Sequence, residues 1–194
     1  MEAALIPRWS VLDADAPTRE TGGEEAFMKL TELFAAELER ESARTRRALE
    51  QVPTGRDDWT PHPKSMPLAR LAGLVASMPS WIPLVIDRDE LELNPKDRGE
   101  YRQPSMGELV AVHDGHVKAA FESLSKTTDD FLFTTNWRLL FDGKPVMEQP
   151  RHVVLRDTFN HLAHHRGQLT VYLRLNDRTV PSIYGPTADD QRFL

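Results

Sequence analysis

The sequence contains no cysteine, which excludes disulfides, cysteine-based zinc sites and a cysteine nucleophile. It also lacks any stretch that approaches the ~20 apolar residues needed to span a membrane. The N-terminal residues show no basic start followed by a long apolar run, so no secretory signal is predicted. These absences together favour a cytoplasmic protein with no membrane partner.

A surplus of basic residues is missing as well. Lysine and arginine number 24, against 30 aspartates and glutamates, and the formal net charge is -6. Proteins that bind nucleic-acid phosphates usually carry a basic face. The densest basic run, residues 44–47, is flanked by glutamates and is typical of a solvated helix face. We therefore predict no nucleic-acid partner.

Amphipathic helical segments dominate what is present. Before them, residues 1–23 carry prolines and paired glycines without a sustained period, so we expect an N-terminal arm. A first helix then ends at Pro53. A second helix begins near Ser65, and Pro79 and Pro83 are expected to kink or stop it.

The middle of the chain predicts a third helix followed by an extended segment. Ser105 and Glu108 have the spacing of a capping box, in which each side chain satisfies a free backbone N–H of the other residue. Residues 129–149 alternate aromatic and other residues and lead into Asp142-Gly143. This pattern predicts a short hairpin-like segment.

A fourth helix is predicted from about Arg151 to Leu175, with an apolar stripe like those of the other three. Helices of this kind bury their apolar faces against each other. We therefore predict that residues 24–194 form one all-α domain, a four-helix bundle. The first connection is the shortest, and the other two are long enough to be crossover connections.

The strongest chemical signal is a pair of histidines in the fourth helix. His161 and His165 are four residues apart, which places both imidazoles on one face of a helix. Two such nitrogens can bind one cation, and neutral imidazole suits zinc, nickel, iron and copper. A pair at this spacing is more often structural or exposed. However, Gln168 and Tyr172 keep the same face polar where a bundle core should be apolar, and a metal is one partner for buried polar groups.

Other catalytic patterns do not match. Leu162 stands where a metalloprotease motif needs glutamate after the first histidine. His164 lies well round the helix from the pair and is expected near the surface. The chain has neither a complete phosphate-binding loop nor a Gly-x-Ser-x-Gly elbow. The pattern therefore assigns no catalytic base.

Several segments, in the right order, resemble the DinB-like superfamily, also described as YfiT-like metal-dependent enzymes. The likeness spans roughly residues 25–190. It is most specific in the last of these segments, which continue from the fourth helix into the tail. The matching segments are residues 43–50, 59–66, 71–81, 160–174 and 180–189.

The resemblance implies a four-helix bundle that holds a divalent metal, most readily zinc or nickel, with three histidines. Two of them match His161 and His165. The third family histidine lies on the second helix, where this chain has Leu74, and leucine cannot bind a metal. The third ligand could instead come from His116 on the third helix, from His62 in the loop before the second helix, or from solvent or substrate. His116 is more simply a core histidine and His62 a loop residue.

The resemblance also implies two functions that differ in class. One is a metal-dependent enzyme such as a thiol-dependent S-transferase, with a small-molecule thiol and an electrophile as partners. The thiol must then be a cosubstrate, because the chain has no cysteine. The other is a non-catalytic bundle that binds a small molecule or dimerises, its metal site degenerate because of Leu74. Relatives often form homodimers, so the resemblance also allows a homodimer.

Overall fold

The computed structural model describes residues 27–93 and 104–192. The predicted arm, residues 1–23, lies outside the described residues. The chain is mostly helical and carries a small three-stranded sheet. In chain order the elements are α1 (Leu30–Leu49), α2 (Leu68–Ser77), the 3₁₀ turn η1 (Met78–Ser80), α3 (Trp81–Asp87), β1 (Glu90–Glu92), α4 (Leu109–Lys126), α5 (Asp129–Thr134), β2 (Asn136–Phe141), β3 (Lys144–Pro150) and α6 (Arg151–Leu175).

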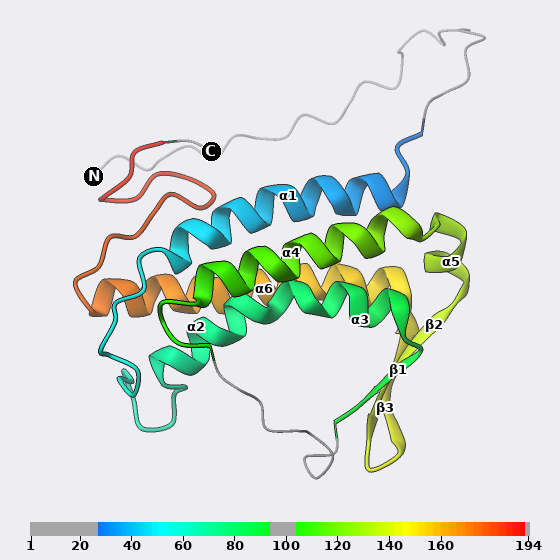
Figure 1. Ribbon diagram of the computed structural model, residues 1–194, viewed down its shortest axis with the longest axis horizontal. Helices are drawn as coiled ribbons and strands as arrows, with labels where there is room; N and C mark the ends of the chain where they lie inside the picture. The colour runs from blue at the N-terminus through cyan, green and yellow to red at the C-terminus, as the bar shows by residue number, and fades with distance from the viewer. Residues whose placement is uncertain (1–26, 94–103, 193–194) are drawn as a thin grey trace, which may run out of the picture.

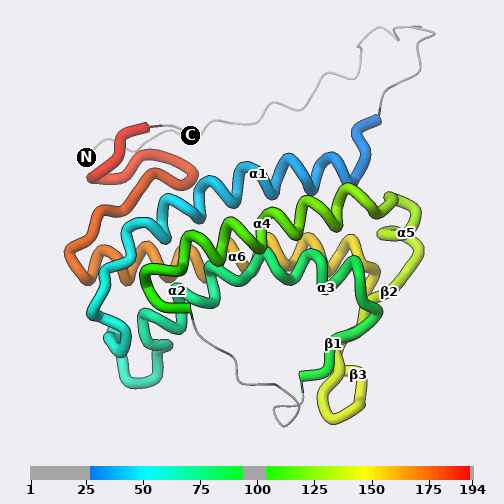
Figure 2. Tube along the Cα trace, viewed as in Figure 1, coloured from blue at the N-terminus to red at the C-terminus, as the bar shows by residue number. Residues whose placement is uncertain are grey.

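The long helices lie side by side, with the sheet at one end of the molecule (Figure 1). Helix α4 contacts α1, α2 and α3, and α6 contacts the same three helices. The C-terminal tail leaves α6 at the end opposite the sheet and turns back beside the C-terminal half of α1 (Figure 2). This return places tail residues against α1, far from them in sequence.

Two adjacent buried clusters form the core along the bundle. One gathers apolar side chains of α2 and of the C-terminal half of α6. The other gathers side chains of α3, α4 and the N-terminal half of α6, together with Trp137 of β2. Leu74 is half-buried and packs against the first cluster, which also contains Leu162 and Leu169 of α6.

The second predicted helix is kinked rather than stopped. Pro79 lies in the 3₁₀ turn η1, and α3 then continues to Asp87. Proline removes one backbone donor and crowds the preceding turn, which accounts for the tighter turn at this point. The whole segment Leu68–Asp87 is long and apolar enough by length and composition to cross a membrane, contrary to the sequence expectation. Of its 18-residue apolar window, 61% is buried inside the fold, as in a core helix.

Some helix bounds differ from the prediction, because α1 ends at Leu49 rather than at Pro53 and α2 begins at Leu68 rather than near Ser65. Helix α6 runs from Arg151 to Leu175, as predicted. Helix α4 begins at Leu109, one turn later than expected. The Ser105 hydroxyl and backbone N–H both donate to Glu108 Oε2, at 2.8 and 3.0 Å. The Glu108 N–H donates to the Ser105 carbonyl at 2.9 Å and not to its hydroxyl, so only half of the predicted capping box is formed.

The small sheet corrects the all-α prediction. Strands β2 and β3 pair antiparallel and β1 pairs parallel to β2, in the order β1-β2-β3. The predicted hairpin turn is confirmed, because Asp142 and Gly143 have φ of 49° and 70°, the left-handed pair of a tight hairpin. The first residues of the predicted hairpin-like segment instead form the short helix α5. Trp137 of β2 is fully buried, so the sheet is part of the core at this end.

Candidate functional site

The two predicted ligands face each other on α6. The Nε2 atoms of His161 and His165 lie 2.9 Å apart, and the ring centroids are 4.6 Å apart. His161 is exposed and His165 is buried. The pair therefore opens toward solvent on the His161 side. His164 is exposed, as predicted, with its ring edge against His165 at 4.9 Å between centroids.

Gln168 fixes the orientation of the buried ring. Its Oε1 lies 2.8 Å from Nδ1 of His165. An amide oxygen only accepts hydrogen bonds, so Nδ1 carries the proton and the Nε2 lone pair points at His161. Ligating histidines commonly have this second hydrogen bond, which sets tautomer and ring direction. Tyr172, also predicted on this face, instead donates its hydroxyl to the Met66 carbonyl at 3.1 Å.

The surroundings of His161 favour its neutral imidazole. Burial lowers the pKa of His161 below its ordinary value of 6.5, and the neighbouring His165 and His164 lower it further. Two rings whose nitrogens are 2.9 Å apart cannot both be protonated on those nitrogens without strong repulsion. Because the His165 Nδ1–H donates to Gln168, the His161 Nε2–H donates to the His165 Nε2 lone pair, and a metal bound by both Nε2 atoms would replace that proton.

The spacing of the two nitrogens is compatible with one shared cation. With metal–nitrogen bonds of about 2.0–2.1 Å, nitrogens 2.9 Å apart would subtend about 90° at the ion. A tetrahedral site needs about 109°, so small ring movements would be required for tetrahedral zinc, whereas an angle near 90° suits tetragonal coordination, as nickel adopts. The donor set thus fits two positions of a metal shell.

A third protein ligand is not brought to this pair by the described residues. Within ranges 27–93 and 104–192, no group of three or more histidine, aspartate or glutamate side chains could hold a metal ion. His116 is half-buried on α4. His62 is exposed in its loop, where its Nδ1 accepts a hydrogen bond from the Lys64 N–H at 3.1 Å. Leu74, at the family position, packs on the core.

The buried histidine of α4 is His113, which the sequence pattern did not single out. It is fully buried, and its Nε2 lies 3.2 Å from the Ser42 carbonyl oxygen on α1. Its Nδ1 has no hydrogen-bond partner. Burial lowers the pKa of His113, with partial opposition from the Ser42 and Ala76 backbone groups. The neutral ring therefore joins α4 to α1 as a packing residue.

A second polar cluster begins at the residue next to His165. Arg166 is 1% exposed, and its Nη2 lies 2.5 Å from Glu41 Oε2 and 2.5 Å from the Tyr184 hydroxyl. Its Nη1 donates to the Thr45 hydroxyl at 2.9 Å and to the Glu41 carbonyl at 3.1 Å. Burial raises the pKa of Glu41, but the charge and hydrogen bonds of Arg166 outweigh it, so the pKa stays below its ordinary value.

Sequence reasoning missed this cluster, although one signal was present. Glu41 follows Phe34 and Leu38 at helical spacing, so it occupies a core-facing position of α1. A carboxylate in such a stripe requires a buried cation. The sequence gives no indication of which arginine provides it, because Arg166 and Tyr184 come from distant segments.

Comparisons with known proteins agree with this architecture. The model of the DinB family matches residues 24–192. An uncharacterized protein of Bacillus subtilis (strain 168), YrdA, is 33% identical over 93 residues, which cover 47% of this chain and 52% of the relative. The match thus spans about half the length of that curated relative.

Two solved structures have a similar fold. A DinB-like protein from Bacillus cereus ATCC 10987 is 28% identical, with a TM-score of 0.58 over 78% of this chain and 95% of its own. A DinB-like protein from Bacillus subtilis, YjoA, is 16% identical and shows the fold alone, with a TM-score of 0.57 over 82% and 99%. The family match covers most of the chain, and the chain belongs to the DinB family.

Proposed function

We propose that this DinB-family protein is metal-dependent and that His161 and His165 are its two protein ligands for a divalent cation, nickel or zinc. The observation that carries the proposal is the 2.9 Å separation of the two Nε2 atoms, with Nδ1 of His165 engaged by Gln168. Because His161 is exposed, solvent or a substrate can reach the remaining positions of the metal shell. The four-helix arrangement expected for this family would then hold the pair on its longest helix.

The reaction we propose is transfer of a small-molecule thiol onto an electrophile. A bound divalent metal lowers the pKa of a coordinated thiol, which makes the thiolate available at neutral pH. The sulfur would form a bond to the electrophilic carbon, the leaving group would depart with the bonding electrons, and the thiol proton would pass to solvent. The thiol must be a cosubstrate because the chain contains no cysteine.

The chain's own contribution is positioning. His165 is buried and held by Gln168, so its nitrogen has a fixed direction. His161 stands at the solvent edge, with its pKa lowered by burial and by the neighbouring histidines. This combination favours the neutral form of His161 and leaves the approach to the pair open.

Cobalt titration followed by thiol addition tests this proposal. Metal-free protein is titrated with Co²⁺, and 2-mercaptoethanol is then added. We expect visible ligand-field bands at one equivalent of Co²⁺ and a new near-ultraviolet thiolate-to-cobalt band after the thiol. His161→Ala should lose both signals, whereas the exposed neighbour variant His164→Ala should keep them. Ligand-field bands without a thiolate band would retain the metal site and refute thiol coordination.

A second function is favoured by Leu74 and by the lack of a third protein ligand among the described residues. The chain would then be a non-catalytic DinB-family protein that binds a small molecule or dimerises. The variant Leu74→His separates the two. If Co²⁺ binds only to this variant and not to the wild type, the wild-type site is degenerate and the second function holds. If the wild type already binds Co²⁺, its metal site is intact and the degenerate-site function is refuted.

A further inference from the structure

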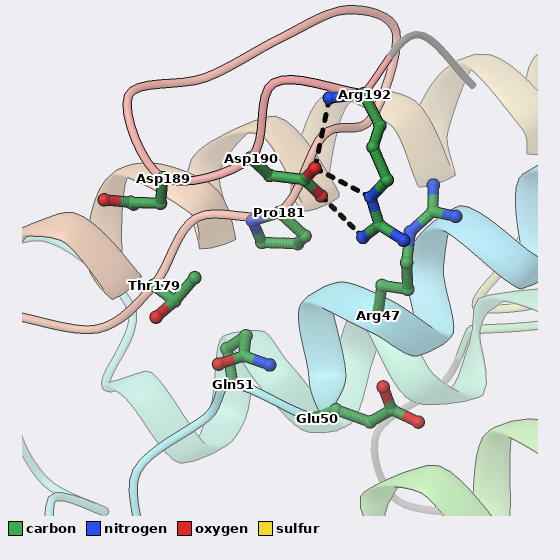
Figure 3. A pocket seen from close by; sticks show the side chains of 8 residues that line it. All are labelled: Arg47, Glu50, Gln51, Thr179, Pro181, Asp189, Asp190 and Arg192. Atoms are coloured by element: carbon green, nitrogen blue, oxygen red, sulfur yellow. Dashed lines mark hydrogen bonds and ion pairs between the residues drawn. The ribbon is translucent and has the colours of Figure 1, made fainter.

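The two ends of helix α1 present different surfaces. At the C-terminal end, a cavity of about 300 Å³ lies between the last turn of α1 and the tail. Figure 3 shows Asp190 and Arg192 of this cavity joined side by side, with two hydrogen bonds of 2.8 Å between their side chains. Three carboxylates and two guanidinium groups line the cavity, so no positive excess is left for an anionic ligand.

The N-terminal end of α1 instead carries exposed apolar side chains. Phe27 and Met28, which precede the helix, are 82% and 69% exposed, and Leu33 is 42% exposed. Phe133 of α5 is 53% exposed. Single exposed apolar residues are ordinary on a protein surface, but a contiguous group of them often marks an interaction site. The position of Phe133 relative to the other three residues decides which case applies.

Helix α5 is joined directly to the start of α1. The Asp129 carboxylate, in the first turn of α5, accepts the backbone N–H groups of Leu30 and Thr31 at 2.7 and 3.0 Å. The first N–H groups of a helix have no partner within the helix, so this carboxylate satisfies two of them. Phe133 follows Asp129 by four residues, one turn along the same face of α5. Its exposed ring is therefore held close to the residues that precede Leu30.

Leu33 and Phe133 both adjoin His152 at the start of α6. The ring centroids of Phe133 and His152 are 4.8 Å apart. Arg156, one turn after His152, pairs with Glu37 at 3.4 Å, and Glu37 is one turn after Leu33. Because α1 and α6 begin at the same end of the molecule (Figure 1), Leu33 lies beside His152. The exposed residues are thus contiguous, and we call them the end patch: Phe27, Met28, Leu33, Phe133 and His152.

The chain itself contains a segment suited to this patch. Residues 4–12 read Ala-Leu-Ile-Pro-Arg-Trp-Ser-Val-Leu, with five large apolar side chains and a single charge, that of Arg8. The connection to Phe27, residues 13–26, is polar and carries five acids and one arginine. The segment lies outside the described residues and before the DinB family match, which begins at residue 24. Apolar side chains gain free energy when they are removed from water, so this segment favours an apolar surface.

The length of the connection allows the segment to meet the end patch of its own chain. Residues 13–26 number fourteen, and a stretch of that length spans at most about 50 Å. The connection ends at Phe27, which is part of the patch, so the tether keeps the segment at a high effective concentration there. The exposed Asp130 lies three residues before Phe133, beside the patch, and complements the charge of Arg8.

We propose that residues 4–12 dock on the end patch of their own chain. Trp9 and the aliphatic side chains near it would cover Leu33 and Phe133, and Arg8 would approach Asp130. Removal of apolar surface from water on both sides drives the docking. The proposal involves neither the histidine pair nor a metal, so it is independent of the proposed function.

Double electron–electron resonance between two spin labels tests this docking. The chain has no cysteine, so Ser10→Cys/Thr134→Cys accepts labels at two positions alone, one in the segment and one beside Phe133. Thr134 is exposed, so a label there does not disturb the core. We expect a single narrow distance distribution between the labels. A broad distribution, as an undocked segment would give, overturns the proposal.

Matched variants and dilution identify the surface that is bound. In the doubly labelled protein, Leu33→Ser should broaden the distribution, whereas Val146→Ser, an equally small change at a 59% exposed position of β3, should leave it narrow. Trp9→Ser should also broaden it, and this variant serves if Leu33→Ser does not fold. A distribution that stays narrow in Trp9→Ser refutes the docking. Excess unlabelled protein should change nothing, and loss of the narrow distance on mixing would show that the segment binds a second copy and would overturn the proposal.

Discussion

His165 and Arg166 are consecutive residues of α6, yet they lie in opposite kinds of environment. Arg166 points into the protein, where Glu41, Thr45 and Tyr184 accept or share its hydrogen bonds. His165 is also buried, but its nitrogens meet only residues of its own helix, Gln168 at Nδ1 and the exposed His161 at Nε2. One side chain joins three segments of the chain, and the other lies beside a residue that reaches solvent.

This difference separates a structural polar cluster from a candidate site. The Arg166 cluster joins α6 to α1 and to the tail, so its energy holds the fold together. The histidine pair joins two residues of one helix, so it contributes little to the arrangement of the helices. A polar group can bind a ligand when its direction is fixed and its partners can be exchanged for the ligand. Breaking each cluster should therefore affect different measurements.

The largest effect is expected from breaking the structural cluster. Glu41→Ala leaves the buried Arg166 charge without its carboxylate, which should lower the free energy of unfolding by about 3–5 kcal/mol. Urea denaturation measures this change. The exposed Glu39 of the same helix is the control, and Glu39→Ala should stay within about 0.5 kcal/mol of the wild type. A loss below about 1 kcal/mol for Glu41→Ala would mean that the cluster does not hold α6 to α1.

A smaller effect, on a different quantity, is expected at the orienting amide. Gln168→Leu removes the acceptor of the His165 Nδ1–H and should weaken metal affinity about 10- to 100-fold. Gln168→Glu keeps an oxygen in place and should restore most of the affinity. Competition with a metal-binding dye gives both values. Stability should barely change, so a large drop in unfolding free energy would place Gln168 with the structural cluster instead.

The smallest expected effect concerns pH and the buried His113. Its pKa is lowered in the folded state by burial, so the unfolded chain binds more protons below about pH 6.5 and stability falls as pH decreases through that range. His113→Gln should reduce the stability difference between about pH 7.5 and about pH 5.5 by up to ~1 kcal/mol.

The pH difference is read from urea denaturation at the two values. If it is the same in His113→Gln and in the wild type, His113 does not act as a buried neutral ring. The same result would test whether His113 is a buried packing residue, in contrast to the exposed His161 of the candidate site.

Local patterns were predictable from the sequence where they depend on neighbouring residues. The bounds of α6 and the Asp142-Gly143 turn follow from periodicity and backbone preference, and both are confirmed. Strand β1 (Glu90–Glu92) was not predicted, because its partner β2 lies some 48 residues later in the chain. Glu90, for example, pairs with Arg138. Short strands of this kind depend on tertiary pairing that periodicity does not report.

The histidine pair of the candidate site was predictable from local spacing, whereas the partners of Arg166 were not. The spacing of His161 and His165 fixes a shared helix face, and the structure brings their nitrogens together. The partners of Arg166 come from α1 and from the tail, so no local pattern identifies them. His113 was passed over in favour of His116, because burial on α4 depends on how that helix is rotated against α1.

The measurement that tests the central claim most directly is metal stoichiometry. Untagged wild-type protein and the double variant His161→Ala/His165→Ala are dialysed against nickel or zinc and analysed for bound metal, with His164→Ala as the matched control. The account predicts about one metal per chain in the wild type and in the control, and none in the double variant, for a site of this ligand type. No metal in the wild type, or equal metal in the double variant, would contradict it.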